Sequence, residues 1–468
     1  MSDPRLEALK PSGDGTGGRE RRIKSIAIQG YRFFQGRIEL GTDGKSLLVY
    51  GENGTGKSSL YRALGLLAGQ GLDRIGQDAN IFGGPLSEVE FAFTDGTTLA
   101  LDADTGELPE AFGFLKPLSI FVPLLDYKRL LRLHYAADST DEHINIYGMV
   151  RELFRDYPHV SGGKISDVRS FPEYFQILDS LLNKELLPAI NELITVFDSK
   201  FALTGFDFST ELDDAGRPNP QIRIKIEYHE TAIDRYHVFL NEARLSALAI
   251  AMYFASILRL MRTVSDHSCK ILVMDDLLIS LDMSNRLRLF EILKTRFAGF
   301  QLFFFTHDKE LFDLYRGKMD WAAYEFYLDD STELPSVIIK RGSTDLERAK
   351  AFYASKDYDA CAVLLRKGFE RLLKAFLPPV DQRDKNCMEL NLSGLIGKAK
   401  ARATGEAKEI LEKLDSDRTH ILNPLCHADS ASIHSQELKS AIDDLGRLAV
   451  LLGEAKPTQT AATARAPR

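Results

Sequence analysis

Cysteine is scarce in this sequence, tryptophan occurs once, and no apolar run is long enough to cross a bilayer. The four cysteines among 468 residues stand far apart, and none forms a CxxC pair. This spacing argues against a zinc module and a disulfide scaffold, and we expect a reducing compartment, the cytoplasm. The longest apolar stretch, residues 245–258, falls short of the roughly 20 residues that a spanning helix needs. We therefore expect no membrane partner.

Both chain ends are polar and poor in large apolar residues. Residues 1–22 lack the apolar core of a signal peptide and predict a disordered lead-in. Residues 456–468 are small, polar and proline-containing, and they predict a disordered tail. The net charge of −8 argues against a wholly basic nucleic-acid coat protein, although a local basic surface could still bind nucleic acid. Partners must therefore be inferred from individual sites.

Short apolar runs alternate with helical patterns between residues 23 and 342. Three such runs, LLVY, KILVMDD and QLFFFTHD, lie at residues 47–50, 270–276 and 301–308. Strands that are apolar on both faces are typical of parallel sheets covered by helices. Two β-rich runs around Asp95-Gly96 predict a hairpin. The predicted fold class is therefore α/β, with a mixed, mostly parallel sheet.

Two further segments have helical periodicity. Residues 173–203 carry apolar side chains at three-and-four spacing, which predicts a helical insertion bent at Pro188, within a lobe of about residues 140–205. Residues 343–455 contain several helical stretches and no strand pattern. We expect a head domain of residues 23–342 followed by an all-α domain of residues 343–455.

The strongest motif is a phosphate-binding loop. Residues 51–58 read GENGTGKS and match GxxxxGK[ST] between a predicted strand and a predicted helix, flanks that a mere glycine-rich turn would not require. Glycines let backbone amides surround an anion, and the following helix adds its positive end. We expect Lys57 on the β- and γ-phosphates of ATP and Ser58 on Mg²⁺. The predicted nucleotide-binding residues are Gly51, Asn53, Gly54, Thr55, Gly56, Lys57, Ser58 and Ser59.

Two adjacent acids end a second apolar run. Asp275 is placed to orient Mg²⁺, which prefers oxygen ligands and keeps several waters. Asp276, one residue on, could orient or polarise an attacking water, and His307, after the next apolar run, could contact a γ-phosphate. The alternatives are that the acids cap a turn and that the histidine is a structural hydrogen-bonding residue. Beside a phosphate-binding loop, the catalytic interpretation is the stronger one.

The order of these motifs resembles that of ABC-type ATPase heads of the SMC, RecF and OLD group. The resemblance implies a Mg²⁺-ATP-binding head that pairs with a second copy, each nucleotide lying between the loop of one head and the signature motif of the other. By position, NEARLSALAI at residues 241–250 matches that signature, with Asn241 and Glu242 at its start. Asp282, in the sequence SLD, matches the loop that crosses the interface, and His307 matches the switch histidine.

The sequence departs from that group at several positions. Asn241, Glu242 and Ala243 replace the usual Ser-Gly-Gly, and Asp276 replaces the usual glutamate, which suggests slow hydrolysis. No glutamine matches the usual Q-loop, for which Asp126 is the nearest position. About 180 residues separate the loop from the signature, without a long heptad run, so we expect a compact head.

The C-terminal domain resembles HEPN-type helical bundles in residues 417–438. Asn423 and His427 match the conserved region of the ribonuclease members, but Leu422 stands where they carry arginine. The simplest interpretation is that Asn423-Pro424 ends a helix and the histidines lie on a helical face. A second is a metal-free RNA-cleaving cluster of Arg418, His420, Asn423 and His427. A third is a bundle that recruits a separate nuclease or toxin.

The sequence thus predicts a Mg²⁺-ATP-dependent ATPase that forms a homodimer or higher homo-oligomer through its heads. The resemblance further implies a role in bacterial anti-phage defence, in which the ATP state senses a trigger or controls an effector protein. Two alternatives remain at this point. One is an ATP-regulated ribonuclease toxin similar to anticodon nucleases, and the other is a RecF-like DNA-repair ATPase that binds duplex DNA.

Overall fold

The computed structural model of the chain divides into two compact units, Met1–Arg341 and Gly342–Arg468. The predicted lead-in and tail lie outside the residues that the structure describes, apart from Arg21 and Arg22. The described residues are 21–121, 123–126, 145–155, 157–159, 162–212, 216–233, 241–261, 268–277, 281, 283–329, 331, 333–342, 344–385, 388–417 and 435–454.

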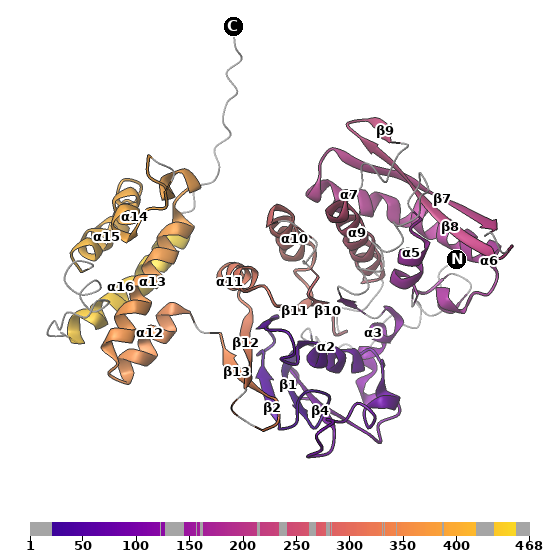
Figure 1. Ribbon diagram of the computed structural model, residues 1–468, viewed down its shortest axis with the longest axis horizontal. Coiled ribbons are helices and arrows are strands. Elements are labelled where there is room, and N and C mark those ends of the chain that lie inside the picture. Colours follow the sequence, from indigo (N-terminus) through magenta and orange to yellow (C-terminus); the bar gives the residue numbers. More distant parts are fainter. Residues whose placement is uncertain are drawn as a thin grey trace, which may run out of the picture. The chain divides into compact units, whose positions relative to one another are not determined.

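A six-stranded sheet organises the first unit (Figure 1). Its order is β13-β12-β3-β11-β10-β6, and every neighbouring pair is parallel except β12 and β13. All residues of β10 and β11 are buried, as expected for apolar strands covered on both faces. The predicted mostly parallel α/β sheet is therefore confirmed. The strands are β3 (Leu47–Gly51), β6 (Leu124–Asp126), β10 (Ile271–Asp275), β11 (Gln301–Thr306), β12 (Ala322–Asp329) and β13 (Ser336–Arg341).

A separate antiparallel sheet is built from the N-terminal strands. Its order is β2-β1-β4-β5, formed by β1 (Ile23–Gln29), β2 (Ile38–Gly41), β4 (Glu88–Phe93) and β5 (Thr98–Asp102). The β4–β5 hairpin turns at Asp95-Gly96, where Gly96 has a φ of 89°. The alternating burial of β4 and β5 shows that one face of this hairpin packs on the core.

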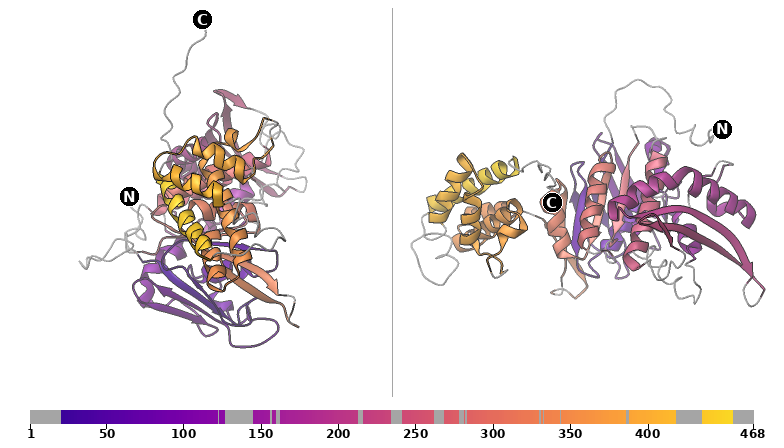
Figure 2. Two further views of the ribbon diagram at one scale, coloured as in Figure 1. Left: turned by 90° about the vertical axis from the view of Figure 1, so that its left-hand side faces the viewer. Right: turned by 90° about the horizontal axis from the view of Figure 1, so that it is seen from above.

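The insertion between β6 and β10 forms a lobe of helices and a third sheet. Strands β7 (Phe201–Leu212), β8 (Pro218–Tyr228) and β9 (Thr231–Ile233) are antiparallel, and Figure 2 shows how far β7 and β8 extend. Helix α6 (Phe171–Asp179) passes through a π-helical segment, Ser180–Leu186, into α7 (Leu187–Phe197). Pro188 lies in the first turn of α7. Proline is tolerated there because the N–H that it lacks would have no partner within the helix.

The remaining helices of the first unit cover or flank these sheets. Helix α9 (Glu242–Met261) is long and apolar enough, by length and composition, to cross a membrane over Ala243–Met261. However, 83% of that window is buried inside the protein, and α9 packs against α7 (Figure 1), so it is used as a core helix. The other helices are α2 (Lys57–Leu66), α3 (Lys116–Phe121), α5 (Tyr147–Leu153), α10 (Met283–Arg296) and α11 (Lys309–Lys318), with short 3₁₀ turns at Leu72–Arg74, Glu110–Leu115 and Ile165–Asp167.

The second unit is helical and has a hydrophobic core of its own. Its helices are α12 (Asp345–Ala354), α13 (Tyr358–Phe376), α14 (Leu392–Lys400), α15 (Glu406–Asp417) and α16 (Ser435–Glu454), with a 3₁₀ turn at Pro379–Gln382. Helices α13 and α16 approach closely at Gly368, where a Cβ would lie 2.7 Å from a methyl carbon of Leu445. The predicted cluster at residues 418–427 lies outside the described residues.

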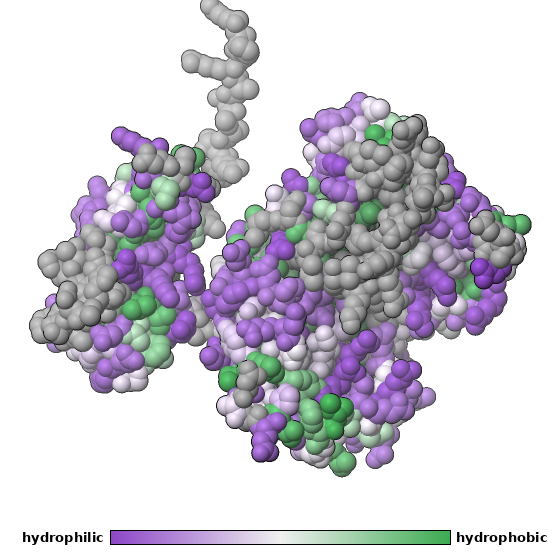
Figure 3. Space-filling model, viewed as in Figure 1, coloured by the Kyte–Doolittle hydropathy of each residue, from purple (hydrophilic) through white to green (hydrophobic). Residues whose placement is uncertain are grey.

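The described surface is mainly hydrophilic in the view of Figure 3, with hydrophobic residues gathered on parts of the first unit. The segment before β4 contributes the most exposed large apolar side chains, Ile81 at 86% and Leu86 at 89%. Both side chains come from one short loop between Ile81 and Leu86.

Candidate functional site

The loop between β3 and α2 has the backbone shape that wraps an anion. Gly54 and Gly56 have φ values of 85° and 95°, which side chains rarely adopt. A Cβ on Gly56 would also lie 2.7 Å from the ring of Phe34. Glycine is therefore required at position 56 by both backbone conformation and packing, and Gly56 leads directly into the N-terminus of α2.

Lys57 lies inside this loop. Its Nζ donates to the carbonyl oxygens of Gly51, at 2.6 Å, and Glu52, at 3.0 Å, and its side chain is buried. Burial lowers the pKa of Lys57, while the negative charges of Asp276 and Asp275 act in the opposite direction. Among the described residues, only backbone carbonyls hold the ammonium group at the loop, and an incoming phosphate could replace these contacts.

The other predicted loop residues divide between exposed and internal positions. Asn53 is exposed at the tip, whereas Thr55 is buried and its Oγ1 donates to the carbonyl oxygen of Glu52 at 2.8 Å. Ser59 turns inward, where its Oγ accepts the N–H of Phe33 at 3.3 Å. Ser59 therefore supports the loop from the protein interior and is not brought to the side that carries Ser58.

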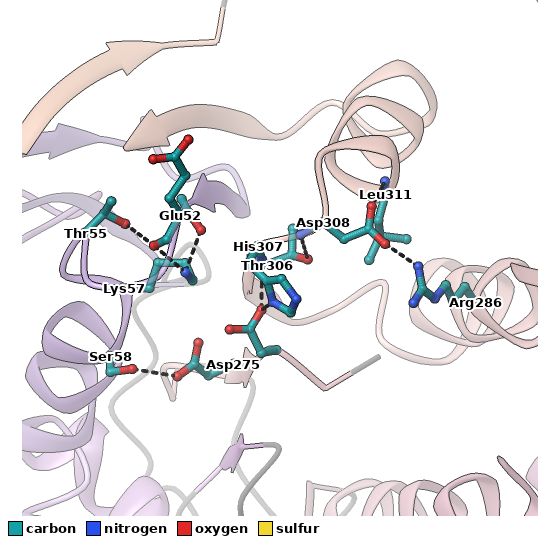
Figure 4. A network of polar contacts seen from close by, with 12 residues as sticks. Glu52, Thr55, Lys57, Ser58, Asp275, Arg286, Thr306, His307, Asp308 and Leu311 are labelled. Carbon is teal, nitrogen blue, oxygen red and sulfur yellow. Dashed lines mark hydrogen bonds and ion pairs between the residues drawn. The ribbon is translucent and has the colours of Figure 1, made fainter. Parts of the chain in front are cut away.

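Ser58 and Asp275 meet at the carboxyl edge of the sheet (Figure 4). The Ser58 Oγ donates to Asp275 Oδ2 at 3.3 Å, while Oδ1 of Asp275 is buried and has no hydrogen-bond partner among the residues that the structure describes. Burial, followed by the charge of Asp276, raises the pKa of Asp275 to about 7, and Lys57 acts in the opposite direction. A buried carboxylate oxygen without a partner is costly, so the site has an unmet need for a cation or a donor.

A third acidic residue, besides Asp275 and Asp276, lies at this edge of the sheet. Asp126 ends β6 and is in register with Asp275 on the neighbouring parallel strand. In the described part of the chain no three His, Cys, Asp or Glu residues gather as a metal cage. One carboxylate and one hydroxyl nevertheless suit Mg²⁺, which takes its remaining ligands from phosphate oxygens and water. Ser58 and the unpartnered oxygen of Asp275 therefore fit the expected metal position.

Asp276 and His307 form a hydrogen-bonded pair. Asp276 Oδ1 accepts both the backbone N–H of His307, at 2.9 Å, and its ring Nδ1–H, at 2.8 Å. Asp276 adopts a φ of 50°, a conformation that aspartate tolerates better than most residues. Because a carboxylate accepts hydrogen bonds, this contact suits the ring tautomer that carries its proton on Nδ1 and has Nε2 as its acceptor. The two residues expected to act separately are thus coupled.

A link through Arg286 was missed from the sequence. Its guanidinium pairs with Asp308 and also donates from Nε to the carbonyl oxygen of Leu281 at 2.8 Å. Asp308 caps α11 by accepting the N–H of Leu311 at 3.1 Å. Arg286 therefore connects the segment after β10 to the helix that follows His307. The Asp308 cap could have been predicted from an acid directly before a helical pattern, but its arginine partner could not.

The signature-like segment begins at an exposed residue. Asn241 Oδ1 accepts the N–H of Arg244 at 3.0 Å, as an N-cap of α9 would. Asn241 and Arg244 line a cavity of about 440 Å³ together with Lys200 and Arg288. The structure does not describe the Glu242 side chain or Asp282, so it does not place them relative to the loop. The same applies to Arg418, His420, Asn423 and His427.

Comparison with known proteins adds little to this geometry. No protein-family model and no curated protein matches the chain. Among solved structures, an SMC head bound to the C-winged helix domain of ScpA is similar at 12% identity and a TM-score of 0.41, over 68% of this chain and 98% of the other. An SMC head domain from Thermotoga maritima is similar at 13% identity and a TM-score of 0.34, over 69% of this chain and 100% of the other.

A third similar structure is an SMC head with an extended coiled coil bound to the C-terminal domain of ScpA, derived from Pyrococcus furiosus. Its sequence identity is 9% and its TM-score 0.38, over 72% of this chain and 100% of the other. At identities and TM-scores this low, the similarity carries no conclusion about activity or partners. Function must follow from the site itself.

Proposed function

We propose that this chain is a Mg²⁺-ATP-binding ATPase of the ABC type. The observation that carries the proposal is the meeting of Ser58 with Asp275, whose second carboxylate oxygen is buried without a partner, beside a loop that holds Lys57. A phosphate in the loop would replace the carbonyl partners of Lys57. Ser58 and Asp275 would hold the metal, which when bound neutralises phosphate charge.

The order of the sheet supports this assignment. Strand β11 lies between β3 and β10, so the loop after β3 and the acids after β10 stand one strand apart at the same edge. The crevice outside the carboxyl ends of parallel strands is the usual ligand position in such sheets. The groups proposed to bind phosphate and metal therefore converge from two segments that are distant in sequence.

The Asp276–His307 pair is the proposed water-activating unit. Asp276 holds the ring of His307 by accepting from Nδ1, which leaves Nε2 free to accept a proton in the neutral ring. The carboxylate would then stabilise the positive charge that develops on the imidazole. In this arrangement Asp276 positions His307, instead of contacting water alone as the sequence suggested.

Head-to-head pairing and control of an effector belong to the same proposal. Pairing is supported by the exposed position of Asn241 at the start of α9, beside Arg244 and a cavity of about 440 Å³. Control of an effector is supported by the sequence resemblance alone. The role in anti-phage defence is supported by the sequence resemblance alone. Protection from phage in a plaque assay should be lost with Lys57→Ala if the ATP state controls the effector.

The first test is nucleotide binding by Lys57→Ala. This variant should lose Mg²⁺-dependent ATP binding and hydrolysis, because the loop loses its only buried cation among the described residues. Isothermal titration with ATP and Mg²⁺ measures the loss. Lys45→Ala is the matched control, since Lys45 pairs with Asp320 at 2.7 Å on the surface and should behave as wild type. Unchanged Mg²⁺-ATP affinity in Lys57→Ala would sink the proposal.

The second test separates a coupled pair from two independent residues. Asp276→Asn and His307→Gln should each lower kcat by about a hundredfold or more, and the double variant should lose little beyond either single one. Asp276→Asn should also accumulate the ATP-bound, paired form, visible as a larger mass by light scattering. Losses that multiply in the double variant would mean that the two side chains act separately.

A further inference from the structure

A second cavity, of about 920 Å³, lies between α5 and the segment that leads into α6. Arg151, Arg155 and Arg169 line it, against the two carboxylates Glu152 and Asp167. Asp167 already accepts the N–H of Lys164 at 2.9 Å, so one of its oxygens is engaged. In the described part of the chain, no carboxylate forms an ion pair with the three arginines. The lining is therefore cationic.

Tyr174 gives the cavity an unmet hydrogen-bonding group. The residue is only 7% exposed, and its hydroxyl is buried without a hydrogen-bond partner in the described part of the chain. The hydroxyl lies within electrostatic range of Tyr147 and Arg151, which line the same cavity, and burial raises its pKa. Buried polar groups are nearly always paired, so a ligand oxygen that reaches the hydroxyl of this lining residue would satisfy it.

The start of α6 points to an anion. Ser170 and Phe171 line the cavity, and α6 runs for nine residues from Phe171. Ser170 stands at the N-cap but makes no capping hydrogen bond through its side chain. Pro172 has no N–H, so the first-turn donors are the N–H groups of Phe171 and Glu173. They receive no side-chain acceptor from Ser170, and a phosphate could accept from them. Arginine forks suit the same group, because they bind phosphate in bidentate fashion.

Aromatic rings complete the lining. Tyr147 and Tyr174 meet edge to face, with centroids 6.0 Å apart, and Phe171 is 37% exposed at the cavity. Flat apolar faces beside a phosphate-binding cluster suit a ligand that carries both a phosphate and an aromatic base. The cavity volume lies in the range of small-molecule sites.

We propose that this cavity is a second nucleotide-binding site, in which Arg151, Arg155 and the start of α6 bind the phosphate of a free mononucleotide. The site is separate from the loop at Lys57, and it does not depend on the ATPase proposal. Segment 145–146 is anchored to β8, where Ile146 N donates to the carbonyl oxygen of Ile222 at 2.9 Å. A ligand here would therefore join α6 to the β7–β8 hairpin through α5.

The test uses radiolabelled AMP in equilibrium dialysis with the full chain and without Mg²⁺. Wild type and Lys57→Ala should bind AMP equally, while Arg151→Gln with Arg155→Gln should bind it about tenfold more weakly or worse, since two charged hydrogen-bond donors are lost. Arg37→Gln with Arg341→Gln is the matched control for charge, because both arginines are exposed and outside the cavity. This control should bind like wild type.

Two further variants guard against a folding artefact and identify the ligand class. Tyr174→Phe keeps the ring but removes the orphan hydroxyl, and it should weaken AMP binding with an unchanged Tm. Phe171→Ala should weaken AMP binding but leave unchanged the affinity for inorganic phosphate, measured by competition.

Several outcomes would overturn the proposal. They are no AMP binding at millimolar concentration, loss of AMP binding in Lys57→Ala, or wild-type affinity in the double arginine variant. Equal affinity for AMP and phosphate would reject the nucleotide. A 5′-phosphorylated oligonucleotide that binds more than about tenfold tighter than AMP would reject a free mononucleotide and assign the site to nucleic acid.

Discussion

Asp275 stands out among the individual residues because its site favours a neutral carboxyl group until a cation arrives. Its pKa is raised to about 7, from an ordinary value of 3.8, by burial and by Asp276. The folded protein therefore holds a proton that the unfolded chain releases. The contribution of this proton to the free energy of unfolding is complete below about pH 4 and is lost as the pH rises towards 7.

Asp275→Asn should remove the loss of stability that ionisation of Asp275 causes at high pH. Without Mg²⁺ and at pH 8, the variant should unfold with a free energy higher than that of wild type by on the order of 1–3 kcal/mol, because no charge is then buried. At pH 4 the difference should vanish. Urea unfolding at the two pH values measures the change, and Mg²⁺-dependent ATP binding should be lost at both. A variant less stable than wild type at pH 8 would contradict the assignment of Asp275 as a buried, unpaired acid.

At the scale of elements, the loop between β3 and α2 depends on close contact with Phe34. Gly56→Ala would place a methyl group 2.7 Å from that ring at a φ of 95°. Gly54→Ala is the matched control, since its φ of 85° imposes similar backbone strain with nothing within 4 Å. We expect Gly54→Ala to lower the free energy of unfolding by about 1–2 kcal/mol and Gly56→Ala by clearly more.

Thermal unfolding without nucleotide compares the two variants. A larger Tm loss for Gly56→Ala would reflect the ring contact, because the backbone strain is common to both. Equal losses would show that Phe34 moves aside, and would remove packing as the reason for glycine at position 56.

The elements that the sequence predicts well are those with a strong local pattern. Strands β3, β10 and β11 each contain a run of at least four apolar residues, and the β4–β5 hairpin carries an Asp-Gly turn, so these elements could be identified from the sequence. Strand β6 has only three residues, and its position depends on pairing with β10. Strands β12 and β13 were likewise not predicted, although they extend the main sheet on the far side of β3.

The sequence identified the residues of the site better than the contacts between them. Lys57, Ser58 and Asp275 converge because the carboxyl ends of parallel strands share one edge, which the motif order implies. The pairing of Asp276 with His307 could not be predicted, since it depends on the left-handed conformation of Asp276 at the end of β10. The bond between Arg286 and Asp308 depends on the packing of α10 against α11, which no local pattern encodes.

At the scale of the whole molecule, two hydrophobic cores imply two unfolding transitions. The core of the first unit surrounds the main sheet, and a separate core lies among α12 to α16. Saturating Mg²⁺-ATP should raise only the transition of the first unit, by about 2.7 kcal/mol at a hundred times Kd. Differential scanning calorimetry with and without nucleotide measures this shift. A single transition that moves as a whole would contradict the independence of the units.

Leu411→Ala offers the converse check on the second core. Leu411 is fully buried on α15, so the variant should lower only the other transition, by about 2–5 kcal/mol. Its neighbour Glu412 is exposed, and Glu412→Ala should leave both transitions in place. ATP hydrolysis should be unchanged in both variants if the units unfold separately.

The order of strands in the main sheet also has a consequence for biosynthesis. Strand β11, the last of the three to be translated, lies between β3 and β10. Until Thr306 has left the ribosome, Lys57 and Asp275 have no strand to hold them at the same edge, although Lys57 is made some 250 residues earlier. A ribosome-bound chain ending before β11 should therefore not retain ATP, and ATP capture would mark the insertion of β11 between β3 and β10 during synthesis.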